Sequence, residues 1–97
     1  MMLQYTALVR KDEGTDYWVD IPDIPGCVAA GETVAIARAR FASALQVHLQ
    51  AMRRHGRSPA PPRSREAVLA AEDTPYEMDY VVEIDSMWLE GGTPDDR

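Results

Sequence analysis

The sequence has one cysteine, no long apolar run and no recognisable targeting segment. Cys27 cannot form an internal disulfide, so a reducing compartment, the cytoplasm, is the expected location. No stretch approaches the roughly 18 consecutive apolar residues of a membrane-spanning helix. The first residues lack the basic start and apolar stretch of a signal peptide. We therefore expect no membrane partner.

Recognisable catalytic and metal-binding signatures are also missing. The sequence has no glycine-rich phosphate loop, no Cys-x-x-Cys pair, no His-Glu-x-x-His and no Gly-x-Ser-x-Gly. His48 and His55 are seven residues apart, whereas metal ligands on a helix usually recur after three or four residues. Cys27 has no histidine close in sequence to activate it. We predict a protein that is not an enzyme, with no catalytic residue, cofactor or bound metal.

The composition is that of one globular domain: 97 residues, of which 45% are hydrophobic and 27% charged. A chain this short has a small core, so we expect a homodimer or a larger assembly. The composition after Trp88 is typical of turns and disorder. We predict a domain over residues 1–88 and a flexible acidic tail over residues 89–97.

Charge is distributed unevenly around a formal net charge of −6. Residues 1–31 hold two basic and five acidic side chains, residues 32–65 hold seven arginines and one glutamate, and residues 66–97 hold one arginine and ten acidic side chains. An acidic chain favours a basic protein partner over a phosphate backbone. The arginines of residues 53–65 lack interleaved aromatics for base stacking, so we expect them to pair with the acidic segment rather than bind nucleic acid.

Alternating apolar residues predict strands over residues 3–9, 17–21 and 78–84. The charged residues 10–16 lie between the first two strands and predict a hairpin. A short third strand is the natural interpretation of residues 27–30.

A long amphipathic helix is predicted over residues 34–55, begun by Thr33 as a cap and ended by Gly56. Ser64 begins a short helix that extends to residue 71. The order β-β-β-α-(short α)-β predicts a two-layer α+β fold. Its last strand must pair with the same sheet or with that of a neighbouring copy, which makes it a candidate for exchange. The apolar stripe of the long helix consists of Val34, Ala37, Phe41, Ala44, Leu45, His48, Leu49 and Met52.

A sharp bend is predicted between residues 22 and 26. Pro25 and Gly26 suit the two central positions of a type II turn, and the Asp23 side chain could cap that turn.

This segment carries a resemblance to a known family. The string Ile21-Pro22-Asp23-Ile24-Pro25-Gly26-Cys27, followed by Gly31-Glu32-Thr33 and an alanine-rich helix, resembles the signature of the HicB-like antitoxins. The likeness extends over about residues 3–85. It implies a partial ribonuclease H-like fold without a working nuclease site, which binds the HicA toxin, a small basic ribonuclease that cuts messenger RNA. The matching motif residues, to which we assign the shaping of the turn and the helix entry, are Pro22, Asp23, Pro25, Gly26 and Gly31.

Two features depart from the family pattern. The first turn of the long helix, Val34-Ala35-Ile36, carries no acidic residue. Many members also continue into a DNA-binding domain after the last strand, whereas this sequence ends at Arg97. We therefore expect no DNA-binding domain here and no repression of its own operon through one.

The predicted partner-binding surface is acidic and aromatic: Trp18, Asp20, Glu83, Asp85 and Trp88. An exposed Trp88 would be costly unless an interface with the toxin or with a second copy covered it. The alternative, that Trp88 folds back onto its own sheet, stays open.

Two other functions are compatible with the sequence. One is an orphan domain of the same fold that has lost its toxin and acts as a self-associating or regulatory scaffold. The other is residual metal-dependent hydrolysis at Asp12, Asp20 and Asp23, which competes with the simpler interpretation of a negative surface and a turn-capping aspartate.

Overall fold

The computed structural model describes residues 1–89 of the chain. Its elements follow the predicted order: β1 (Met2–Lys11), β2 (Tyr17–Ile21), β3 (Ile24–Gly31), α1 (Val34–Arg54), α2 (Arg65–Ala71), β4 (Met78–Asp85) and the 3₁₀ helix η1 (Ser86–Leu89). The predicted α+β class is confirmed. Leu89 ends η1, and the rest of the predicted tail lies outside the described residues.

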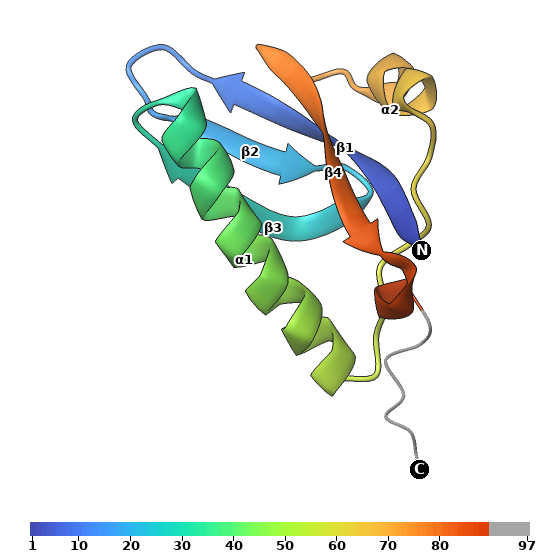
Figure 1. The fold of residues 1–97 in the computed structure, drawn as a ribbon. Helices are drawn as coiled ribbons and strands as arrows, with labels where there is room; N and C mark the ends of the chain where they lie inside the picture. Colours follow the sequence, from blue (N-terminus) through green and yellow to red (C-terminus); the bar gives the residue numbers. More distant parts are fainter. Residues whose placement is uncertain (90–97) are drawn as a thin grey trace.

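The four strands form one antiparallel sheet in the order β3-β2-β1-β4. The last strand pairs with β1 of its own chain, with Leu3 opposite Ile84 and Val9 opposite Met78. In Figure 1, β4 lies beside β1, and α1 lies across β2 and β3. The two edge strands are therefore β3 and β4.

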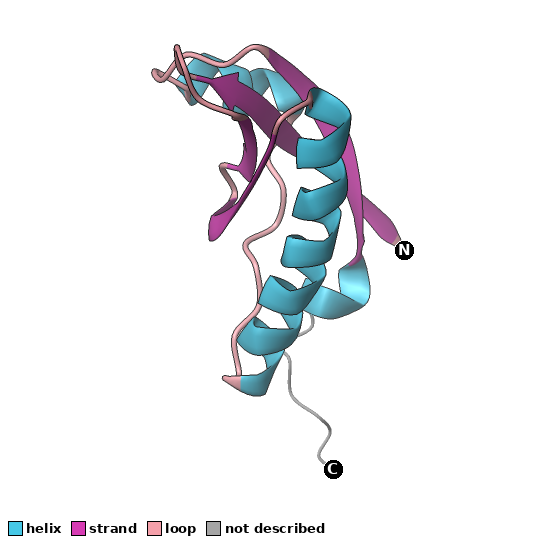
Figure 2. Cartoon of the chain, turned by 90° about the vertical axis from the view of Figure 1, so that its left-hand side faces the viewer, coloured by secondary structure: helices cyan, strands magenta, loops and turns pink. Residues whose placement is uncertain are grey.

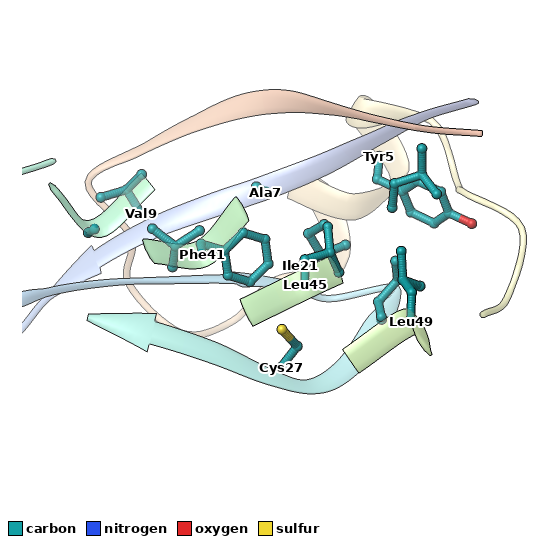
Figure 3. Packing of buried hydrophobic residues seen from close by; sticks show 12 residues of the cluster. Tyr5, Ala7, Val9, Ile21, Cys27, Phe41, Leu45 and Leu49 are labelled. Carbon is teal, nitrogen blue, oxygen red and sulfur yellow. The ribbon is translucent and has the colours of Figure 1, made fainter. Parts of the chain in front are cut away.

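The core lies between one face of the sheet and α1. Tyr5, Ala7 and Val9 of β1 alternate onto this face, as the sequence predicts, and are fully buried. The helix contributes Ala37, Phe41, Leu45 and Leu49 from the predicted stripe, and Figure 3 shows Phe41 and Leu45 between the strands and the helix axis. The buried Tyr5 hydroxyl donates a hydrogen bond of 2.6 Å to the Ala60 carbonyl, which holds the connector after α1 against the core.

Local signals at both ends of α1 act as predicted. The Thr33 hydroxyl accepts a hydrogen bond from the Ile36 N–H at 3.1 Å, and Gly56 adopts a φ of +70° after the last turn. The Ser64 hydroxyl accepts from the Ala67 N–H at the start of α2. The His55 ring forms a hydrogen bond with the last turn of α1, in which Nδ1 lies 2.8 Å from the Ala51 carbonyl oxygen.

The opposite face of the sheet is covered in part by α2. Thr6, Leu8 and Arg10 alternate onto this face of β1 and are buried, and α2 packs against β1 with its own buried Val68. In Figure 2, the two helices lie on different sides of the strands. The sheet therefore has a long helix on its inner face and a short one on its outer face.

The prediction of a type II turn centred on Pro25 and Gly26 is wrong. The chain turns at Pro22 and Asp23, between the paired residues Ile21 and Ile24. Pro25–Gly26 lies inside β3, which is longer than the predicted strand. The register with β2 shifts between Asp20 and Ile21, so the residues after Ile24 form a bulge in β3. Gly26 lies in this bulge and has the positive φ of +94° that glycine allows.

Asp23 does not cap that turn with its side chain. Its carboxylate accepts a hydrogen bond from the Arg63 backbone N–H at 2.8 Å and another from Arg63 Nε at 2.7 Å. The aspartate is thus used to fasten the connector between α1 and α2 to the β2–β3 hairpin. At Gly31 the backbone approaches α1 closely, because a Cβ there would lie 2.6 Å from the Ala37 nitrogen.

Candidate partner-binding surface

Strand alternation places four of the five predicted partner-binding residues on the outer face. Trp18 and Asp20 lie opposite Arg10 and Leu8 of β1, while Glu83 and Asp85 of β4 lie opposite Gln4 and Met2. Successive side chains point to opposite faces, so these residues point away from the inner core. The four residues on the outer face are Trp18, Asp20, Glu83 and Asp85.

The Asp20 carboxylate is occupied by a buried arginine. Arg10 donates from Nε and Nη2 to the two carboxylate oxygens, at 2.7 and 3.2 Å, in a bidentate pair. Its Nη1 donates to Glu72 at 2.9 Å, and its guanidinium lies 5.3 Å from the centre of the Trp18 ring. Asp20 and Trp18 therefore form a structural network with Arg10. The sequence predicts Arg10 in the charged hairpin loop, whereas it lies in β1.

This network and a second ion pair neutralise acidic groups within the chain. The hydrogen bond from Arg10 lowers the pKa of Glu72, and the hydrogen bond from Arg65 lowers the pKa of Asp79. The two hydrogen bonds between Arg65 and Asp79 are 2.6 and 3.0 Å long. The predicted pairing of basic residues with the acidic segment is thus confirmed at Arg65.

Among the predicted surface residues, the two carboxylates at the end of β4 are the ones that no arginine of the described chain binds. Glu83 is exposed and forms no ion pair within residues 1–89. Asp85 accepts a hydrogen bond from the Met87 N–H at 2.9 Å, and its nearest cation is the N-terminal amine of Met1 at 3.9 Å. The outer edge of the sheet at β4 is therefore negative.

Trp88 packs against its own core instead of pointing into solvent. It is partly buried in η1, and the Arg53 guanidinium lies 4.3 Å from the centre of its ring. Arg53 also donates to the Met87 carbonyl oxygen at 2.8 Å. These contacts support the alternative in which Trp88 folds back onto its own sheet.

Two shallow hollows, of about 270 and 290 Å³, lie between β4 and α1, and Ala42 lines both. The two hollows together are called the groove. Burial raises the pKa of Tyr80, whose ring lies 3.9 Å from the Arg38 guanidinium at one end of the groove. The contact between Arg38 and Tyr80 was not predictable from local sequence, because it joins α1 to a strand that follows much later. Residues that line the groove include Ala42, Leu45, Tyr80, Val82, Ile84 and Trp88.

The three aspartates proposed for hydrolysis do not converge. Asp12 lies at the β1–β2 hairpin, Asp20 binds Arg10, and Asp23 binds Arg63. Within residues 1–89, no three His, Cys, Asp or Glu side chains gather to hold a metal ion. Cys27 is buried, and burial raises the pKa of its thiol. None of the helices in the described part of the chain has the length and apolarity needed to cross a bilayer.

A family profile described as "HicB_like antitoxin of bacterial toxin-antitoxin system" matches residues 5–93. The chain belongs to this family. The crystal structure of the N-terminal domain of the Burkholderia pseudomallei antitoxin HicB matches with a TM-score of 0.67 and 27% identity, over 86% of this chain and 99% of that domain.

Other HicB structures share the fold. The longer Burkholderia pseudomallei HicB structure gives a TM-score of 0.68 and 26% identity, over 98% of this chain and 72% of that one. Antitoxin HicB3 gives 0.64 and 26%, over 86% of this chain and 62% of that one. Among curated sequences, the UPF0150 protein Ta0767 of Thermoplasma acidophilum is 30% identical over 53 residues, which are 55% of this chain and 77% of the relative.

Proposed function

We propose that this chain is an antitoxin that binds and neutralises a HicA-type toxin, a small basic ribonuclease, by covering its active surface. The observation that carries the proposal is the HicB-like family match over residues 5–93. In this proposal the chain acts in the cytoplasm by binding rather than by catalysis, and it makes no direct contact with nucleic acid. The net charge of −6 suits a basic partner.

The acidic end of β4 is the part of the predicted surface that we assign to toxin contact. Glu83 is exposed and free of ion pairs within the described chain, and Asp85 lies on the same face. Asp20 and Trp18 contribute less in this proposal, because Arg10 already engages both. Trp88 supports the surface from behind by packing against the core.

Co-expression with the small basic protein encoded by the neighbouring gene tests the proposal. That protein alone should stop growth and degrade messenger RNA, and co-expression of this chain should restore growth and yield a complex that co-purifies. A neighbour that is harmless alone, or that does not co-purify, would contradict the proposal. The absence of such a gene would favour the orphan scaffold.

A charge reversal with a matched control locates the contact. Glu83→Lys should lower the affinity for the toxin, and increasing salt should reduce the difference in affinity between the variant and the wild type. Glu32→Lys changes the net charge by the same amount, but Glu32 lies between β3 and α1, at the other edge of the sheet. Equal weakening by both variants would show that net charge, and not the β4 surface, determines affinity.

A further inference from the structure

The two edges of the sheet differ in how well they are protected against a further strand. The β3 edge contains Pro25, which has no N–H to donate, and the bulge that follows Ile24. Arg40 Nη1 also donates to the Ala30 carbonyl oxygen at 3.2 Å, and α1 packs along β3. This edge is closed by several devices at once.

The β4 edge has none of these devices. Met78–Asp85 contains no proline or glycine, and its pairing with β1 is continuous from Met2 to Val9. No strand of the described chain lies beyond β4. Val81 in the middle of the strand is 51% exposed. An edge of this kind is a template for strand addition.

The hydrogen-bond phase of β4 identifies the backbone groups that face outward. The Ser86 N–H donates to the Met1 carbonyl oxygen at 2.7 Å, and these two residues continue the register of Met2 with Asp85. Directly opposite residues that share such a bond alternate with residues that do not. The N–H groups of the even-numbered residues of β4 therefore point to β1, and the free edge presents those of Asp79, Val81, Glu83 and Asp85.

Charge argues against a second copy of the same strand as the occupant. Two copies of β4 that pair about a two-fold axis place residues of equal parity opposite each other. A centre at Val81 sets Asp79 against Glu83, a centre at Val82 sets Asp79 against Asp85, and a centre at Glu83 sets it against itself. Like charges directly opposite each other on an antiparallel pair are destabilising. The edge is complementary instead to a strand with basic side chains on its outer face.

We propose that the free edge of β4 binds an extended strand of the toxin, so that the antiparallel sheet continues from one protein into the other. This inference rests on the proposed function. The bound strand alternates: its outer side chains are Lys or Arg opposite Glu83 and Asp85, and its inner side chains are apolar and lie toward the groove between β4 and α1. Backbone hydrogen bonds hold the strand, and the alternation selects it.

A proline at Val81 tests the edge without cutting the sheet. Val81→Pro removes an N–H that points away from β1, and proline is tolerated at such edge positions. Val81→Thr is the matched control, because it changes the side chain and keeps the N–H. The neighbour protein is co-expressed with this chain, separated from it and then titrated calorimetrically with each variant. The affinity of Val81→Pro should be about tenfold to a hundredfold lower than that of the wild type, since a carbonyl of the toxin strand is left unpaired. Val81→Thr should bind like the wild type.

Hydrogen exchange of the wild-type chain gives a second measurement that needs no variant. Without the toxin, the amides of Asp79, Val81 and Glu83 should exchange faster than those of Tyr80 and Val82. In the complex, both sets should be protected.

The outcomes separate the two proposals. A folded Val81→Pro variant that keeps wild-type affinity, or edge amides that stay unprotected in the complex, would overturn the edge inference and leave the antitoxin function standing. A wild-type chain that does not bind the neighbour protein would overturn the function itself. A wild-type dimer that Val81→Pro converts to a monomer without loss of toxin binding would assign the edge to a second copy and overturn the inference.

Discussion

The buried Arg10 network offers a quantitative test of the fold. Arg10 makes five hydrogen bonds, to both oxygens of Asp20, to Glu72 and to the carbonyl oxygens of Thr74 and Pro75. Its side chain is 6% exposed, and the side chains of Asp20 and Glu72 are 20% and 13% exposed. Arg10→Met keeps the side-chain volume and leaves two largely buried carboxylates without their cation.

Removing one partner of a buried ion pair costs about 3–5 kcal/mol. We expect Arg10→Met to lose about 3 kcal/mol of unfolding free energy, at the lower end, because both carboxylates keep some access to water. For a domain of this size that loss lowers the Tm by roughly 12–24 °C. Urea and thermal unfolding followed by circular dichroism measure both quantities.

A compensating variant separates the ion pair from simple packing. Arg10→Met combined with Asp20→Asn and Glu72→Gln removes the stranded charges together with the arginine, and it should recover part of the lost stability. Arg10→Lys keeps the charge but not the bidentate fork, so it should fall between the wild type and Arg10→Met. A loss below about 1 kcal/mol for Arg10→Met would refute the reasoning, because surface ion pairs are worth that much or less.

Three further predictions concern stability. Gly31→Ala should lower the Tm in a thermal melt more than Gly14→Ala. A Cβ at Gly31 would lie 2.6 Å from backbone, whereas at Gly14 it would meet nothing within 4 Å and cost only the strain of the φ of +78°; equal losses would contradict the helix contact. Stability from Glu72, whose pKa is lowered from 4.5, should be complete above that pH and decline as the pH falls through its folded pKa, and Glu72→Gln should flatten this decline in acid titrations of urea unfolding. Asp23→Ala should speed proteolysis of the connector near Arg63, and an unchanged cleavage rate would show that the two hydrogen bonds do not hold it.

Local signals in the sequence predicted most of the fold. The spacing of Phe41, Leu45 and Leu49, with Thr33 and Gly56 at the ends, predicts α1 because helix caps and apolar periodicity depend only on neighbouring residues. Strand alternation predicted which face of β1 and β4 lies toward α1, but not that the other face of β1 is buried as well. These features need no knowledge of distant parts of the chain.

The turn and the site depended on distant contacts. Pro22–Asp23 and Pro25–Gly26 are both acceptable turn pairs, and the choice between them is coupled to Arg63, which holds Asp23 from forty residues further on. Arg10 is a surface residue by composition, but Glu72 makes its burial possible. Sequence alone could not supply either pairing.

The pairing of β1 with β4 has a consequence for synthesis of the chain. Strand β1 is complete at Lys11, and its second neighbour is complete only at Asp85. At synthesis rates of about 5–20 residues per second, one edge of β1 therefore stays without a partner for about 4–15 s on every ribosome. On a polysome, during this interval, a finished β4 from a preceding chain competes for the same edge. The order of strands thus sets a time window in which two copies can exchange their last strand.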